Sequence, residues 1–148
     1  MLIILPPSET KAAGGDGSPL DFTTLSFPML NPKREDIASD LIRLPMSEVL
    51  GVLGVSAKQQ KLAECNKVLM SSPTLPALLR FTGVLYDALS ATTLSPAAWR
   101  RLAVGDALFG LLMASDRIPM YRLSGNTKLP RPDGTTPTMK SRWGKEIS

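Results

Sequence analysis

The sequence limits the chemistry available to this chain before any structural element is assigned. It contains no histidine and a single cysteine, Cys65. Histidine-dependent nucleophilic catalysis, imidazole metal sites and zinc sites built on several cysteines are therefore excluded. We expect Cys65 to be a small core residue, and we expect neither a metal nor a cofactor. Any chemistry must use amine, guanidinium, carboxylate, hydroxyl or phenol groups.

A first group of such side chains follows an apolar run. Residues 2–5 (LIIL) lead, after two prolines, into Ser8, Thr10 and Lys11. The carboxyl end of a core strand is a common position for a ligand site in α/β folds. Two hydroxyls and a lysine beside a glycine-rich loop are suited to hold a phosphate or another anion. The alternative is a polar turn that leaves the core and binds nothing.

A second group of polar side chains follows the apolar residues 108–113. Its members are Asp116, Arg117, Tyr121 and Arg122. In one interpretation Arg122 binds a phosphate, with the Tyr121 hydroxyl beside it and Asp116 orienting it. In the other, Asp116 pairs with Arg117, and Tyr121 closes the core with its hydroxyl in water.

Positive charge accumulates toward the end of the sequence. Beyond residue 116, seven bases stand against two acids, whereas the rest of the chain has ten bases and eleven acids. This asymmetry suits a polyanionic partner, and DNA phosphates are the expected one. The alternative is a solvated basic surface with Trp143 tucked against the body. The predicted DNA contacts are Arg117, Lys128, Arg131, Lys140, Arg142 and Lys145.

The elements that must position these groups are short. The length of 148 residues indicates one domain. The apolar spacing predicts a doubly buried strand at 2–5 and a strand at 107–115. It also predicts helices that start at Asn31 and Ser47, at Ser56 with a capping box to Gln59, and at Ser95. The helix from Ser56 should run to Met70, and the helix from Ser95 to about Val104.

The predicted fold class is α/β in the mixed α+β sense, as a single domain. Short buried strands would combine with several short helices, and the sheet can be incomplete. Residues 1–125 would form the body, and residues 126–148 a basic segment rich in proline and glycine that is a loop or a partly disordered tail. No apolar run approaches the ~20 residues of a membrane helix, and the start lacks a signal-peptide pattern. We therefore expect a cytoplasmic protein without a membrane partner.

Four stretches together resemble the peroxide stress protein YaaA family. They are LIILPPSETK, FTGVLYDALSA, ALFGLLMASDRIPMYRLSGNTKLP and RWG, in this order along the chain. The resemblance implies a cytoplasmic protein that helps cells to survive hydrogen peroxide by limiting free iron. It also implies DNA binding through a basic cleft and a helix-hairpin-helix near residues 52–66. Members continue well past this length, so the chain resembles the N-terminal part of a member.

Two functional hypotheses follow from these observations. The first is a DNA-binding stress protein that contacts phosphates without sequence preference and affects iron damage indirectly. The alternative is an enzyme or binder of a phosphorylated or nucleotide-like small ligand, in which Ser8, Thr10, Lys11 and Arg122 converge. We expect a binding protein rather than an enzyme. An incomplete sheet would leave a free edge that can promote self-association.

Overall fold

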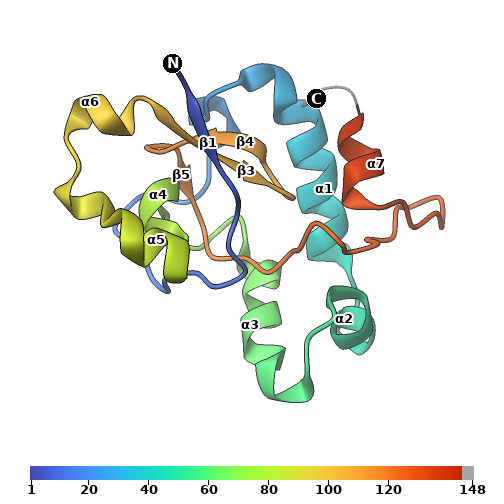
Figure 1. The fold of residues 1–148 in the computed structure, drawn as a ribbon. Helices are drawn as coiled ribbons and strands as arrows, with labels where there is room; N and C mark the ends of the chain where they lie inside the picture. Colours follow the sequence, from blue (N-terminus) through green and yellow to red (C-terminus); the bar gives the residue numbers. More distant parts are fainter. Residues whose placement is uncertain (145–148) are drawn as a thin grey trace.

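The computed structural model describes residues 1–144 of the chain, so the predicted DNA contact Lys145 lies outside the described residues. The described part is a mixed α/β domain, as predicted, with a small central sheet and short helices around it (Figure 1). Among the described residues, none of the helices is both long enough and apolar enough to cross a bilayer.

The central sheet has three strands in the order β1-β3-β4. β1 (Ile3–Leu5) runs parallel to β3 (Leu102–Asp106), and β3 pairs antiparallel with β4 (Gly110–Met113). A second, two-stranded sheet joins β2 (Leu75–Pro76) to β5 (Arg117–Ile118). Because β1 and β3 are parallel, their carboxyl ends lie at the same edge of the sheet.

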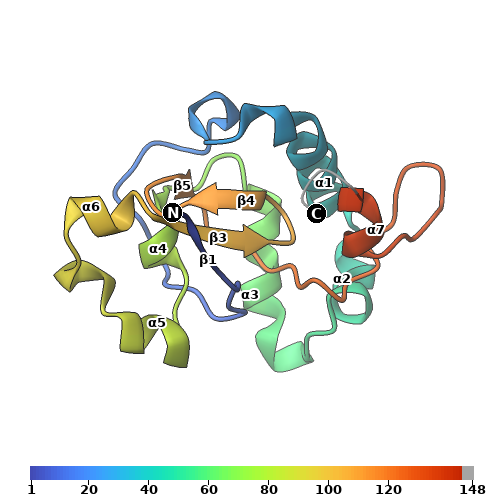
Figure 2. The ribbon, with the colours of Figure 1, turned by 45° about the horizontal axis from the view of Figure 1, so that its top comes forward.

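Helices surround this sheet on several sides (Figures 1 and 2). α1 lies beside α7 in both views, and α4, α5 and α6 form a separate group near β1. The helices are α1 (Asn31–Arg43), α2 (Met46–Leu53), α3 (Gln60–Glu64), α4 (Ala77–Arg80), α5 (Val84–Leu89), α6 (Pro96–Trp99) and α7 (Met139–Trp143). Short 3-10 helices lie at Phe22–Thr24, Pro28–Leu30, Ala57–Gln59, Cys65–Val68 and Ala91–Thr93.

The first strand is correctly predicted, but its environment is not. The apolar run at 2–5 predicted a strand covered on both faces. Instead β1 is an edge strand, and Ile3 and Ile4 are 44% and 59% exposed. The physical reason is that only one neighbour, β3, pairs with it among the described residues, so one side of the strand stays open.

Two helices are shorter than the sequence pattern predicts. Ser95 caps α6 as expected, since its Oγ accepts a hydrogen bond from the Ala98 N–H at 3.2 Å. The helix ends at Trp99, however, and β3 occupies residues predicted to be helical. Pairing of β3 with strands on both sides overrides the local helical pattern. The capping box from Ser56 to Gln59 is confirmed, but the helix that follows breaks into α3 and a 3-10 turn.

Residues 126–144 are part of the folded body and not a loose tail. Leu129, Met139 and Trp143 belong to the same buried core as the sheet. The Trp143 indole donates a hydrogen bond to the Ala107 carbonyl at 2.7 Å. Lys128 forms a bridge with Thr138, which closes the intervening residues into a hairpin. Three buried apolar side chains outweigh the proline and glycine content of this segment.

A buried arginine fixes the loop that follows β1. Arg80, at the end of α4, is fully buried, and all its guanidinium nitrogens donate to backbone carbonyls. Its Nη1 donates to Ala12 O at 2.7 Å and to Gly14 O at 2.8 Å, and its Nη2 donates to Ile118 O at 3.0 Å. One side chain thus ties the segment after Lys11 to β5, which places the two predicted polar groups near each other.

Candidate functional site

A small cavity lies where the chain leaving β1 meets the chain leaving β5. In Figures 1 and 2 both segments come together beside the carboxyl-terminal part of the α3 region. The cavity has a volume of about 160 Å³. We term it the Lys11 pocket, and its lining residues are Glu9, Thr10, Lys11, Gln59, Met120, Tyr121 and Arg122. It unites members of both predicted polar groups that are more than a hundred residues apart in the sequence.

The Lys11 amine is half-buried between aromatic rings. Its Nζ lies 4.5 Å from the centroid of the Tyr121 ring and 5.5 Å from that of Phe81. It also donates a hydrogen bond to the Ser8 carbonyl at 3.3 Å. Burial lowers the pKa of Lys11 below its usual value; the Asp106 carboxylate opposes this change and the Arg122 guanidinium adds to it. The ammonium form is therefore less favoured than on an exposed lysine.

Hydrogen bonds to its backbone fix the position of Arg122, and its side chain lines the pocket. The buried Asn66 side chain accepts the Arg122 N–H at 2.8 Å and donates to the Arg122 carbonyl at 2.9 Å. The guanidinium donates to the Glu9 carbonyl at 3.3 Å and lies 3.6 Å from the exposed Glu9 carboxylate. An ion pair of that length with an exposed partner is weak, so the guanidinium can exchange it for a ligand anion.

Tyr121 forms a wall of the pocket and is 1% exposed. Its ring packs edge-on against Phe109 at 5.5 Å. Burial, together with the nearby Asp106 carboxylate, raises the pKa of Tyr121 well above its usual value, so the phenol stays protonated. Asp106 itself accepts hydrogen bonds from the backbone N–H groups of Leu108 and Phe109.

The two predicted hydroxyls form the approach to the pocket. Ser8 Oγ and Thr10 Oγ1 are 3.1 Å apart, and Thr10 Oγ1 donates to the Thr82 carbonyl at 3.0 Å. Thr10 lines the pocket, whereas Ser8 contributes its carbonyl to Lys11. Gly83 faces both oxygens: a Cβ there would lie 3.2 Å from Ser8 Oγ, and its φ of +118° suits only glycine.

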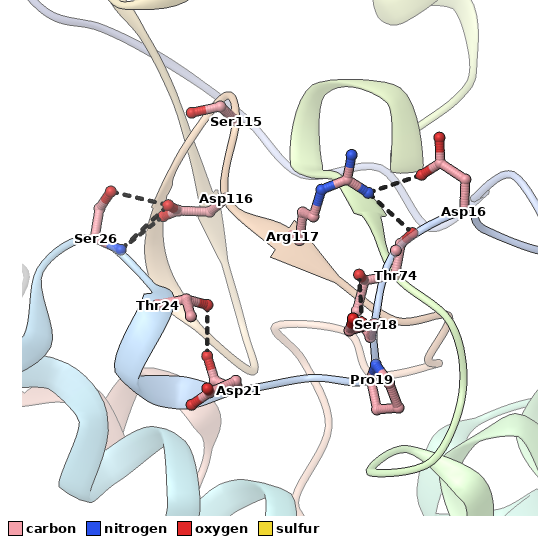
Figure 3. Close-up of a pocket in the computed structure, with 11 residues that line it drawn as sticks. Asp16, Ser18, Pro19, Asp21, Thr24, Ser26, Thr74, Ser115, Asp116 and Arg117 are labelled. Atoms are coloured by element: carbon pink, nitrogen blue, oxygen red, sulfur yellow. Dashed lines mark hydrogen bonds and ion pairs between the residues drawn. The ribbon is translucent and has the colours of Figure 1, made fainter.

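The interpretation in which Asp116 orients Arg122 is wrong. Asp116 accepts hydrogen bonds from the Ser26 N–H and hydroxyl and from the Met113 N–H. It lines a different and larger cavity of about 830 Å³, which Figure 3 shows. Its pairing with Arg117 is also wrong, because Arg117 forms an ion pair with Asp16 at 2.8 Å. Asp116 directly precedes β5 and Arg117 begins it. Their side chains reach different loops, because Asp116 contacts Ser26 and Arg117 contacts Asp16.

This larger cavity is lined mainly by polar side chains, several of which already have hydrogen-bond or ion-pair partners within the protein (Figure 3). Asp21, for example, accepts hydrogen bonds from the Thr23 N–H and hydroxyl. Among the described residues, no group of three or more acidic or cysteine side chains is placed to hold a metal ion. We assign the candidate site to the Lys11 pocket, because it brings a lysine and an arginine from the two predicted polar groups together.

The predicted DNA contacts divide into exposed and structural residues. Lys128, Arg131 and Lys140 are exposed and belong to the hairpin and helix after residue 125. Arg142 is a structural residue, since it is 5% exposed and pairs with the buried Asp40 of α1. Its prediction as a DNA contact is contradicted by this burial, which arises because α7 packs its inner face on α1.

Sequence reasoning missed several contributors to the site. Gln59 and Met120 line the pocket, and Asp106 acts on it through its charge. Gln59 was recognised only as a capping residue, which it also is, because its Oε1 accepts the Ser56 N–H at 3.2 Å. Met120 carries no chemical signal, and Asp106 lay in a segment expected to link a helix to a strand.

Comparison with known proteins gives the family of this chain. A model of the family described as "Peroxide stress protein YaaA" matches residues 1–148. The chain belongs to the peroxide stress protein YaaA family. The resemblance that the four sequence stretches suggested is therefore confirmed. Every residue of the Lys11 pocket lies within the part that the YaaA family model matches.

Similar proteins occur in Corynebacterium and Streptomyces species. The chain is 60% identical over 148 residues to a UPF0246 protein of Corynebacterium efficiens, and 58% identical to one of Corynebacterium glutamicum. Both matches cover 100% of this chain and 60% of the relative. A UPF0246 protein of Streptomyces coelicolor is 42% identical over 137 residues, covering 88% of this chain and 53% of its own length. The chain thus spans less than two thirds of these relatives.

Proposed function

We propose that this protein acts in the peroxide stress response by binding a phosphate-bearing ligand in the Lys11 pocket. The observation that carries the proposal is the convergence of Lys11 and Arg122 on one small cavity. Among the described residues, Lys11 has no carboxylate within ion-pair distance, and Arg122 has only the long contact with Glu9. An anion placed between them would relieve the repulsion between two neighbouring positive charges. We place this activity in the cytoplasm.

The chemistry of the remaining lining residues supports an oxyanion over other ligands. The Gln59 amide offers a further hydrogen-bond donor, and the guanidinium of Arg122 matches a phosphate in its planar fork. The volume of about 160 Å³ favours a phosphate with a small attached group over a whole dinucleotide. The family description supplies the physiological context of peroxide stress.

Binding can be tested by titrating inorganic phosphate and small sugar phosphates into the protein with calorimetry. We expect Arg122→Ala to lose binding and Arg100→Ala, an exposed arginine outside the pocket, to retain it. Unchanged binding in Arg122→Ala would contradict the proposal.

A second candidate function is binding to the DNA backbone without sequence preference. Two features favour it. Exposed Lys128, Arg131 and Lys140 lie in one folded hairpin-and-helix segment. The region where the family resemblance implies a helix-hairpin-helix contains the end of α2, a left-handed Gly54 at φ 68° and the Ser56 turn before α3.

The DNA hypothesis has its own assay. Affinity for duplex DNA should fall by about 0.9 log units per log unit of salt for each phosphate contacted. Lys128→Ala and Lys140→Ala should each reduce the slope by about one contact, because each variant removes one phosphate partner. A flat salt response, or the absence of binding at low salt, would rule out this second function.

A further inference from the structure

The Lys11 amine has the surroundings of a nucleophile. It lies against the faces of Tyr121 and Phe81 rather than against a carboxylate, and it lines a cavity. Lysines that are desolvated, or that lie beside another cation, are the ones that react with carbonyl compounds in enzymes. Lys11 meets both conditions, because it is half-buried and Arg122 lines the same cavity.

The protonation equilibrium of the Lys11 amine also supports its role as a nucleophile. Burial lowers the pKa of Lys11, and the Arg122 guanidinium lowers it further, against the opposing effect of Asp106. A larger fraction of the amine is therefore neutral than on a fully exposed lysine. The protonated Tyr121 phenol beside it bears no charge that would restore the ammonium form.

We propose that Lys11 forms an imine with the aldehyde of a small sugar phosphate whose phosphate is bound by Arg122, an inference that rests on the phosphate site proposed above. The neutral amine attacks the carbonyl carbon, and the carbonyl oxygen takes up a proton to give a carbinolamine. Loss of one water molecule then forms the carbon–nitrogen double bond. No oxidant or reductant is required, and hydrolysis of the imine returns the amine and the aldehyde.

The geometry restricts the carbonyl compound to a short one. The amine and the guanidinium lie on one cavity of about 160 Å³, so the aldehyde and the phosphate must be separated by a few carbon atoms. Two sources meet this requirement. One is a free phosphorylated aldose, and the other is the ring-opened deoxyribose of an abasic site in DNA, which carries an aldehyde and flanking phosphates.

Reductive trapping tests the proposal. The protein is incubated with glyceraldehyde 3-phosphate and cyanoborohydride near pH 7, and the modified residue is mapped by mass spectrometry. Reduction fixes the adduct as a secondary amine, with a mass gain equal to the aldehyde less one oxygen atom. We expect labelling at Lys11, loss of this label in Lys11→Arg, a strong reduction in Arg122→Gln, and no change in the matched control Lys61→Arg.

Two further arms identify the source and separate the inference from the site. A duplex with one abasic site replaces the aldose in one arm, and glyceraldehyde without phosphate replaces it in the other. Preferred trapping of the duplex assigns the abasic site, and preferred trapping of the aldose phosphate assigns the small molecule. Equal labelling of Lys11 and Lys61, or equal reaction with and without phosphate, would overturn the inference.

If Lys11 is not labelled, phosphate binding measured by calorimetry shows which of the two proposals is wrong. If calorimetry detects phosphate binding that depends on Arg122 but Lys11 is never labelled, the imine is wrong and the phosphate site stands. If neither occurs, the site itself is wrong. The melting temperature of Lys11→Arg, together with a second variant, Lys11→Met, checks that loss of labelling does not arise from unfolding.

Discussion

Replacement of Arg142 distinguishes a structural residue from a DNA contact. Its guanidinium pairs with Asp40 of α1, and the two side chains are 3% and 5% exposed. Removing one partner of a buried pair typically costs about 3–5 kcal/mol, because the other charge stays buried without compensation. We therefore expect Arg142→Leu to unfold more easily than the parent, while retaining whatever affinity for DNA the parent has.

Two observations place the expected loss of unfolding free energy in Arg142→Leu at the lower end of that range. Arg43 also pairs with Asp40, so the carboxylate keeps one partner in the variant. In addition, Nε and Nη1 of Arg142 have no hydrogen-bond partner among the described residues, so the parent already bears part of the desolvation cost. We expect a loss of about 3 kcal/mol, which for a domain of this size lowers the melting temperature by about 10 °C.

Urea unfolding of the parent, Arg142→Leu, Asp40→Asn and the double variant measures the effect. The double variant should lose less than the sum of the single losses, because the two substitutions remove one shared interaction. DNA affinity is measured in parallel, with exposed Lys140→Ala as the matched control on the same helix. If Arg142→Leu keeps its stability and loses DNA affinity, the assignment of Arg142 as a structural residue is refuted.

Two further predictions concern stability around the site. The pKa of Tyr86 is raised by burial, and secondarily by Asp106, to about 12 from 10.0, so its contribution to stability is present below pH 10 and is lost toward pH 12. From pH 10 to pH 12 the free energy of unfolding of the parent should thus fall by about 3 kcal/mol more than that of Tyr86→Phe. Urea unfolding at each pH measures both values, and an equal fall in the two proteins would contradict the prediction. Gly83→Ala should cost about 1–3 kcal/mol, since alanine is strained at φ +118° and its Cβ would crowd Ser8 Oγ. Gly51→Ala, in open space on α2, is its control and should be neutral or stabilising in the same thermal melts; equal losses in both would refute the backbone argument.

Local signals in the sequence predicted the parts of the fold that depend on neighbouring residues. Ser95 and the Ser56–Gln59 box cap their helices as expected. Such caps are recognisable because a side chain satisfies backbone groups only two or three positions away. Asn31, the expected N-cap of α1, is instead its first helical residue, and Leu30 takes the cap position without a side-chain hydrogen bond. The alternative hypothesis of a small-ligand binder expected Ser8, Thr10, Lys11 and Arg122 to converge, and the structure brings all but Ser8 to one pocket.

The sequence by itself determined which chemistry is available, since a chain without histidine must rely on lysine, arginine and hydroxyl groups. Only the tertiary structure decided which charges are free to act. Arg117, Arg122 and Arg142 look equivalent in the sequence, yet one pairs with Asp16, one lines the pocket and one is buried against Asp40. Their partners lie about a hundred residues away in the chain, and the energy of a charge depends on burial and on those partners rather than on its neighbours.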